Sequence, residues 1–197
     1  MSRNNSKLFN MTITALLFAI VIILQTVGGS FKIGSTSFSF VLLPIVVGSI
    51  TMGAATGGFL GLVFGVITVI AGITAQDFFT FTLIQAQPVF TVLVCLLKAV
   101  LAGVVPAFVY KALKEKNNTL AIFLASASAP IVNTLVFIVG GLLFFGDALT
   151  EAGFLGANTL LYFLVIGCAG INFIAELGIN IIFAPAISRI INAFKSH

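Results

Sequence analysis

Long apolar runs with almost no charge are the feature that most limits what this chain can fold into. Only 7% of its residues are charged, whereas soluble domains carry about 25%, so few charges are available to cover a water-exposed surface. Six apolar runs can be drawn within the 197 residues, at about 8–27, 38–50, 52–73, 88–113, 120–145 and 158–191. We therefore predict an all-α integral membrane protein with six transmembrane helices, folded as a single domain over residues 1–197.

The second and sixth runs depart from the usual length of a membrane span. The run 38–50 is too short to cross a hydrocarbon core about 30 Å thick. We therefore expect a short second helix that is tilted, broken or shielded by its neighbours. The run 158–191 is longer than a bilayer requires, so it must tilt or extend beyond the membrane.

The positions of the basic residues predict the orientation of the bundle. With an even number of crossings both termini lie on one side, and most of the Lys and Arg residues fall there. They are Arg3, Lys7, Lys111, Lys114, Lys116, Arg189 and Lys195. The opposite side carries Lys32, Asp77, Asp147 and Glu151. Because cytoplasmic loops carry an excess of Lys and Arg, we predict cytoplasmic termini in a multi-pass protein of a bacterial cell membrane. The long outward loops are then 28–37, 74–87 and 146–157.

Small residues recur at helical spacing in two of the runs. The glycines from Gly53 to Gly65 follow one another every four residues, which places them on one stripe where another helix can approach closely. Ala15 and Ala19 have the same spacing in the first run. Their stripe could face the bundle itself or another subunit, and the spacing alone does not choose between the two.

Lys98 is the most informative polar residue because it stands alone in an apolar run. The segment 88–110 contains no other charge, and a cation at the centre of a bilayer costs roughly 2.5–3.5 kcal/mol on insertion scales. A charge at that depth normally has a buried partner or a ligand. Two interpretations compete. One is an ion pair with Glu176, the only acidic residue deep in an apolar run. The other is a contact with the carboxylate of an anionic substrate.

The helical rise of about 1.5 Å per residue places Lys98 about 15 Å below the outer surface. The same estimate places Asn133 about 20 Å from the cytoplasmic end of its run and Asn172 about 20 Å from the outer end of its own. Glu176 and Asn180 follow Asn172 at intervals of four residues, on one helical face. We therefore expect the deep polar residues of three helices to meet near the centre or in the outer half of the bundle.

Other polar residues each have two open interpretations. Asn133 and Thr134 either form hydrogen bonds between helices or bind hydroxyl or amide groups of a ligand. Gln85 and Gln87, at the outer end of the fourth run, either cap a loop or line the mouth of a substrate site. The phenylalanines of the stretch DFFTFT (77–82) either form an interfacial belt or cover an apolar part of the ligand. Our candidate substrate-binding residues are Lys98, Asn133, Thr134, Asn172, Gln85 and Gln87.

Several functional classes find no support in the sequence. The chain has no Walker motif, no Ser-His-Asp constellation and no cluster of His and Cys residues at metal-ligand spacing. We therefore expect no catalytic residue, no metal site and no cofactor in this chain. The net charge of +4 follows from the membrane orientation and does not indicate nucleic acid. Two alternatives stay open. One is a self-sufficient secondary transporter that uses Lys98 and Glu176 as a proton or ion relay, and the other is a small membrane enzyme or assembly protein.

Several stretches together resemble the substrate-binding S components of energy-coupling factor (ECF) vitamin transporters. They are SFVLLPIVVGSITMGAATGGFLGLVFG (39–65), VLVCLLKAVLAG, APIVNTLVF and the ending APAISRII. They occur in this order, together with the short second run and the spacing of Ala15 and Ala19. The resemblance covers nearly the whole chain.

The resemblance implies a subunit that binds a vitamin from outside and docks on a transmembrane coupling subunit. That subunit would be attached to two ATPase subunits, where ATP and Mg would act. The resemblance also implies that Ala15 and Ala19 face the coupling subunit and that the loop 28–37 acts as a gate. The pattern is most like the pantothenate branch, and a deep Lys beside Asn and Thr suits this small, anionic, hydroxylated and amide-bearing vitamin. Pyridoxine, riboflavin and folate stay open as alternatives, although a chain without Trp is less suited to stacking a large flat ring.

Overall fold

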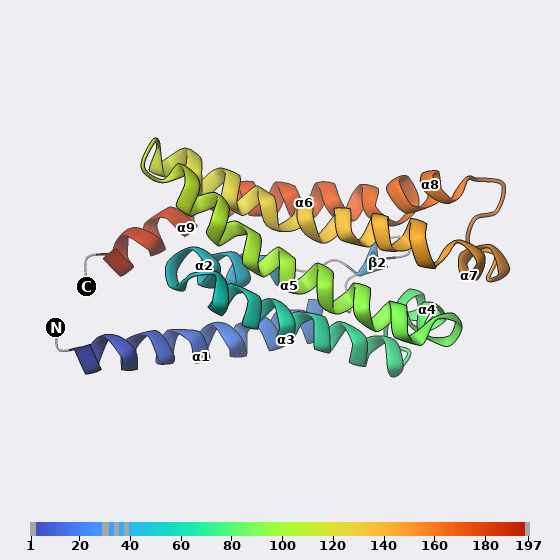
Figure 1. Cartoon of the computed structure of the whole chain (residues 1–197), viewed down its shortest axis with the longest axis horizontal. Coiled ribbons are helices and arrows are strands. Elements are labelled where there is room, and N and C mark those ends of the chain that lie inside the picture. Colours follow the sequence, from blue (N-terminus) through green and yellow to red (C-terminus); the bar gives the residue numbers. More distant parts are fainter. Residues whose placement is uncertain (1–2, 29–31, 34–35, 38–39, 196–197) are drawn as a thin grey trace.

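Five helices in the described residues are long and apolar enough to cross a membrane, and a shorter apolar helix accompanies them. The computed structural model describes residues 3–28, 32–33, 36–37 and 40–195. The main elements are α1 (Arg3–Gly28), α2 (Leu42–Met52), α3 (Ala54–Ile73), α5 (Pro88–Leu113), α6 (Asn118–Phe144) and α9 (Ile171–Lys195). They run along the length of the molecule (Figure 1). The prediction of an all-α integral membrane protein of about six helices is confirmed.

Local sequence signals set the ends of the two helices that carry much of the polar site. The α5 helix begins at Pro88, whose fixed φ and missing N–H suit the first helical position. The α6 helix is capped by Asn117, whose side chain accepts a hydrogen bond from the backbone N–H of Leu120 at 3.0 Å. The fourth and fifth predicted runs therefore match α5 and α6 to within two residues.

The segments predicted as outward loops contain short regular elements. The strands β1 (Lys32–Ile33) and β2 (Thr36–Ser37) pair antiparallel within the proposed gate 28–37, and residues 29–31 and 34–35 of that gate lie outside the described residues. The α4 helix (Phe78–Ala86) fills most of the segment 74–87, and α7 (Gly146–Glu151) begins the segment 146–157. The α4 segment is helical because Phe79 and Leu83, one turn apart, bury one face of it.

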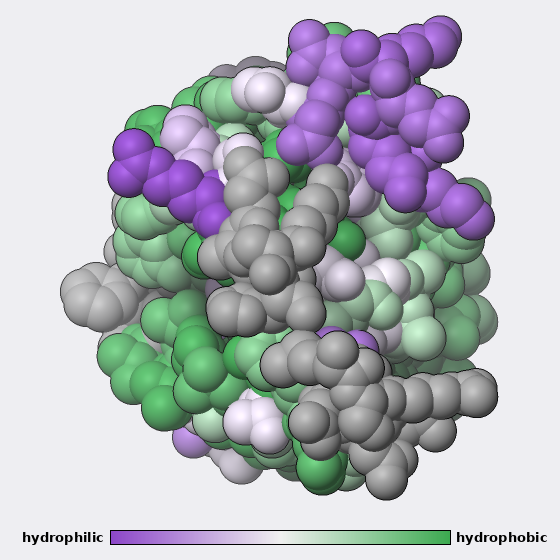
Figure 2. All heavy atoms as spheres, turned by 90° about the vertical axis from the view of Figure 1, so that its left-hand side faces the viewer, coloured by the Kyte–Doolittle hydropathy of each residue, from purple (hydrophilic) through white to green (hydrophobic). Residues whose placement is uncertain are grey.

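The two ends of the bundle differ in charge. Both chain termini lie at one end (Figure 1), which we call the termini end, and α4 and α7 lie at the other, which we call the far end. The turn between α5 and α6 exposes Lys111, Lys114 and Lys116 at the termini end. Figure 2 looks onto this end and shows hydrophilic side chains gathered along its edge, beside hydrophobic surface. Asp77 and Asp147 belong to the far end, so the charges follow the asymmetry from which the orientation was predicted.

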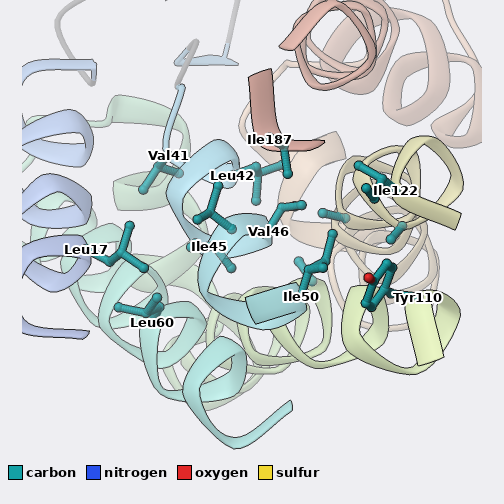
Figure 3. Close-up of a cluster of buried hydrophobic side chains, with 14 of the residues drawn as sticks. Leu17, Val41, Leu42, Ile45, Val46, Ile50, Leu60, Tyr110, Ile122 and Ile187 are labelled. Carbon is teal, nitrogen blue, oxygen red and sulfur yellow. The ribbon is translucent and has the colours of Figure 1, made fainter. Parts of the chain in front are cut away.

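The short helix α2 lies inside the termini-end half of the bundle. Eight of its eleven residues are buried, and Figure 3 shows Ile45 and Val46 among side chains from the surrounding helices. The α2 helix is about 16 Å long, so it does not cross the membrane alone and is shielded by its neighbours. We call the apolar cluster around it the termini-end core. Its members include Leu17, Leu42, Ile45, Val46, Leu60, Ile122 and Ile187.

The helices α3 and α5 approach each other backbone to backbone. A Cβ atom at Gly57 would collide with the carbonyl oxygen of Gly103, and one at Gly61 would collide with that of Ala99. Only glycine permits this approach, so part of the predicted stripe packs as expected. Gly53 has a different role, because its φ of 95° lies in the left-handed region and allows α2 to turn directly into α3.

A second apolar cluster, the far-end core, lies toward the opposite end and is rich in phenylalanine. It consists of Phe79, Leu83, Val94, Phe145, Leu149, Phe163, Leu164 and Cys168, with Phe137 and Phe154 among the half-buried side chains that pack against it. The ring of Phe79 contacts that of Phe154 edge to face, with centroids 5.5 Å apart. The far-end core therefore joins α4 and the segment that follows α7 to the ends of the long helices.

The last membrane span is not a regular α-helix. It runs through α8 (Leu160–Tyr162), the π-helical segment η1 (Phe163–Gly170) and α9. A π-helical segment has wider turns than an α-helix and often occurs at functional sites. The buried side chains of η1 are apolar, as in Leu164 and Cys168. The buried polar side chains of this span, Glu176 and Asn180, come after it in α9. The predicted sixth run is therefore one span with a change of helical geometry inside it.

Candidate functional site

Lys98 lies in the middle of α5 and is half-buried. Its ammonium nitrogen Nζ is 5.4 Å from the ring centroid of Phe137 on α6. A cation at this distance is attracted by the ring face, by about 0.5–2 kcal/mol depending on how far it is desolvated. The geometry therefore gives the deep cation an aromatic contact that does not neutralise its charge.

Three polar side chains of α9 form a ladder along one face, which we call the α9 ladder. The side-chain amide of Asn172 donates a hydrogen bond to Oε1 of Glu176 at 3.3 Å. The side-chain amide of Asn180 donates to the backbone carbonyl of Glu176 at 2.8 Å. Glu176 and Asn180 are 5% and 2% exposed, so the ladder lies within the protein and not against lipid.

Asn133 of α6 faces the α9 ladder. Its side chain is buried and lies within hydrogen-bonding reach of the Glu176 carboxyl group. Among the described residues, six buried side-chain oxygens have no hydrogen-bond partner, and four of them belong to this group. They are Oδ1 of Asn133, Oδ1 of Asn172, Oε2 of Glu176 and Oδ1 of Asn180. Buried polar atoms are normally paired, so four unpaired acceptors on two neighbouring helices mark a place where hydrogen-bond donors could bind.

Lys98 and Glu176 interact electrostatically but remain separate. The field of Lys98 acts on the Glu176 carboxyl group. Within the part of the chain that the structure describes, however, Lys98 forms no ion pair and contacts the ring of Phe137 instead. Of the two interpretations of Lys98, the direct ion pair is not the arrangement observed. The cation is thus available to an anionic group.

The site as a whole combines one cation with several acceptors. A carboxylate could reach Lys98, and hydroxyl or amide N–H groups on the same molecule could donate to the unpaired oxygens of Asn133 and Glu176. No nucleophile with an adjacent base is part of the arrangement. In the residues for which coordinates are described, no three His, Cys, Asp or Glu side chains gather as a metal ion would require. The geometry therefore suits binding.

The remaining candidates lie at different distances from this group. Thr134 is half-buried and follows Asn133 in α6. Gln85 and Gln87 are exposed at the junction of α4 and α5, and Gln87 lies roughly 16 Å from Lys98 along the helix axis. The structure does not bring these two glutamines to Lys98. They lie at the far end of the bundle, and their role in binding stays a prediction.

Ala15 and Ala19 lie on the outside of the molecule. Both are exposed, and only 11% of the apolar window of α1 is buried, against 29–39% in the other spans. The α1 helix is held to the bundle mainly through Leu17 and Val21, which are buried on its other face. Of the two interpretations of the alanine stripe, the structure therefore favours the one in which it faces outward.

Comparison with known proteins gives a match over nearly the whole chain. Residues 9–188 match the family described as the substrate-specific component of ECF transporters. The chain belongs to this family. A curated relative, the pantothenic acid transporter PanT of Lactococcus lactis subsp. cremoris (strain MG1363), is 28% identical, and the aligned region covers 92% of this chain and 93% of the relative. This S component is therefore a multi-pass cell-membrane protein and a transport subunit for a small-molecule substrate.

One side chain of the S component's candidate site was missed by the sequence reasoning. Phe137 is one of 21 phenylalanines, and an aromatic side chain in an apolar run is equally typical of lipid contact, core packing and a site. The available signal was its position four residues after Asn133, which places both on one face of α6. Asn180 was recognised as part of the polar face of α9 but was not among the candidate binding residues.

Proposed function

We propose that this S component binds a small anionic vitamin with hydrogen-bond donors, best matched by pantothenate. The observation that carries the proposal is a deep cation, Lys98, that has no ion pair among the described residues and lies near unpaired acceptor oxygens. Pantothenate offers a carboxylate for Lys98, with hydroxyl and amide N–H groups for the acceptors of Asn133, Asn172 and Glu176. The printed name of the relative, a pantothenic acid transporter, supports the same ligand.

The proposal extends to energy coupling. The chain contains no ATP-binding motif, so we propose that ATP hydrolysis, with Mg, takes place in two partner ATPases that act through a transmembrane coupling subunit. The S component would receive the vitamin from outside and release it inside when docked on this module. The exposed stripe of Ala15 and Ala19 supports α1 as the docking face, because small side chains let another helix approach closely.

Ligand-induced stabilisation of the purified S component tests the substrate. A ligand that binds only the folded state at about 100 times its Kd adds about 2.7 kcal/mol of stability. We expect a clear rise in Tm with pantothenate and a much smaller rise with its neutral alcohol analogue at the same concentration. Pyridoxine, riboflavin and folate serve as controls. A rise with one of these alone would replace pantothenate with that vitamin, and equal rises with pantothenate and its alcohol would remove the carboxylate contact.

Two tryptophans on α1 test the docking face. The double substitution Ala15→Trp and Ala19→Trp should abolish co-purification with the coupling subunit and vitamin uptake, because two large rings prevent close helix approach. Pantothenate binding by the isolated subunit should persist. The control is Leu135→Trp, at an exposed position on α6, away from α1 (Figure 1), which should still dock. Normal uptake by the double variant would place docking elsewhere, and uptake driven by a proton gradient without ATPases would favour a secondary transporter.

A further inference from the structure

The separation of Lys98 and Glu176 requires a physical cause. Opposite charges attract strongly where the effective dielectric constant is low, and the field of Lys98 does act on the Glu176 carboxyl group. Lys98 also has a long, flexible side chain that can adopt many rotamers. When the Glu176 carboxyl group is ionised, the ammonium group without a competing contact would be drawn toward it.

The Glu176 carboxyl group is held in place by contacts with α9 and α6. Oε1 of its carboxyl group accepts a hydrogen bond from Asn172 at 3.3 Å, and Asn133 lies within reach of the same carboxyl group. The residue is buried in α9, where its backbone carbonyl also accepts a hydrogen bond from Asn180 at 2.8 Å. The carboxyl group is therefore tied to the α9 ladder, and any ion pair would have to form by movement of the lysine.

Lys98 is held on the opposite side by a ring that is itself fixed. The ring of Phe137 lies 5.4 Å from Nζ of Lys98 and contacts Phe79 edge to face, with centroids 6.0 Å apart. Phe79 is buried and also contacts Phe154 and Phe163, at 5.5 Å and 6.4 Å. Phe137 thus connects the lysine to the far-end core through the ring of Phe79 on α4, which in turn packs against Phe163 of η1.

We propose that Phe137 is a positioning residue that holds the Lys98 ammonium group away from Glu176, so that the cation stays available to the ligand's carboxylate. The ring face attracts the cation without neutralising it, and therefore competes with Glu176 but gives way to a ligand carboxylate, which forms a stronger charge-assisted contact. This inference rests on the proposed binding of an anionic vitamin. It makes the charge selectivity that Lys98 provides depend on a neighbouring residue that carries no charge.

The decisive quantity is the ratio of the Kd of the neutral alcohol analogue to that of pantothenate, measured by titration calorimetry on the intact S component. In the F137L variant the lysine loses its aromatic contact and pairs with Glu176, so pantothenate must break that pair. We expect the ratio to fall about tenfold, within the range set by the loss of a desolvated cation–π contact. F137Y retains a ring face and should keep the ratio of the wild type.

A second pair of variants separates this role from simple packing. If Phe137 acts by keeping Lys98 from Glu176, then F137L should change the ratio little in an E176Q background, because the competing charge is gone. If Phe137 only fills space, F137L should weaken both ligands equally in either background, and this result would overturn the inference. The matched control is F144L, which removes a stacked ring from the same helix, 4.4 Å from Phe90, and should leave the ratio unchanged.

The outcomes distinguish this inference from the proposed function. A wild-type protein that binds pantothenate and its alcohol equally, or binds neither, overturns the anionic-vitamin proposal itself. A wild-type protein that prefers pantothenate, together with F137L that prefers it to the same degree, overturns only the role of Phe137. If F137L fails to fold, a melting curve will show this, and Phe137→Met, with a long apolar side chain and no ring, is measured in its place.

Discussion

The two halves of this bundle differ in the chemistry of their buried side chains. The termini-end core packs mainly aliphatic side chains around α2. Among the described residues, the unpaired buried side-chain oxygens outside the candidate site are those of Ser49 and Ser126. Toward the far end, the protein instead places a cation, a carboxyl group and several amides beside a cluster of phenylalanine rings. Unpaired polar groups inside a protein cost free energy. This difference fits the proposed function, in which the unpaired polar groups cost stability in the free protein and gain partners when a ligand binds.

Removing the deep cation should have the largest effect on this comparison. Lys98→Met keeps the apolar stem and removes the charge, so we expect pantothenate affinity to fall about 100-fold, equivalent to about 3 kcal/mol. Titration calorimetry would measure the loss, and the melting temperature without ligand should stay close to that of the wild type. Lys111→Ala, an exposed lysine on the same helix, is the control and should bind normally. Unchanged affinity in Lys98→Met would remove this residue from the site.

Truncating the centre of the termini-end core should lower stability and leave the ligand preference unchanged, the opposite of the effect expected for Lys98. Ile45 is fully buried, and Ile45→Ala would leave a cavity that lowers the free energy of unfolding by about 2 kcal/mol. We expect an earlier unfolding transition in detergent, while the ratio of affinities for pantothenate and its alcohol stays the same. Ile70→Ala, at a position 52% exposed on α3, should unfold like the wild type. A changed affinity ratio in Ile45→Ala would mean that the two halves are not separate.

Asn180, in the α9 ladder, should show whether an unpaired buried oxygen contributes to ligand affinity at a cost in stability. Asn180→Leu removes a buried oxygen that has no partner and an amide bonded only to a backbone carbonyl of its own helix. If this oxygen receives a donor from the ligand, affinity should fall about fivefold, the effect of losing about 1 kcal/mol. The protein without ligand should melt no earlier than the wild type. A lower melting temperature with unchanged affinity would assign Asn180 to the fold.

The smallest effect is expected for a polar contact that stabilises helix packing away from the candidate site. The hydroxyl group of Tyr110 donates a hydrogen bond to Oδ1 of Asn118 at 2.8 Å, between α5 and α6 near their turn. Tyr110→Phe should lower the free energy of unfolding by about 1 kcal/mol or less, and binding should not change. Chemical denaturation of the two proteins in the same detergent would measure the difference. A loss of affinity here would show that the termini end communicates with the site.

The sequence predicted the helical framework well because hydropathy and helical spacing carry that information directly. The apolar runs, the proline that begins α5 and the glycines at 57 and 61 all act through local chemistry or close packing that a periodic pattern reveals. The same spacing placed Asn172, Glu176 and Asn180 on one face of one helix. Estimates of depth were sufficient to bring Lys98 and Asn133 to the same region, and the part of these residues in substrate binding stays a prediction.

The arrangement of side chains within the site could not be predicted in this way. Lys98 contacts the ring of Phe137, and the spacing of four residues from Asn133 is too weak a signal to single this ring out from the other phenylalanines. The helix α4 was hidden because its nine residues are few enough to be taken for a loop between two spans. These features depend on contacts between segments far apart in the chain, which periodicity within one segment does not report.

The π-helical segment η1 has a consequence for insertions and deletions. Its wider turns affect the rotation of everything that follows, so the loss of one residue between 165 and 170 would change the rotation of α9 about its axis relative to α8. Such a deletion would leave the hydropathy profile and the number of spans almost unchanged. It would nevertheless move Glu176 and its neighbouring asparagines out of their present alignment with Lys98. A shortened homologue of this kind would look intact as a membrane protein and would have lost the candidate site.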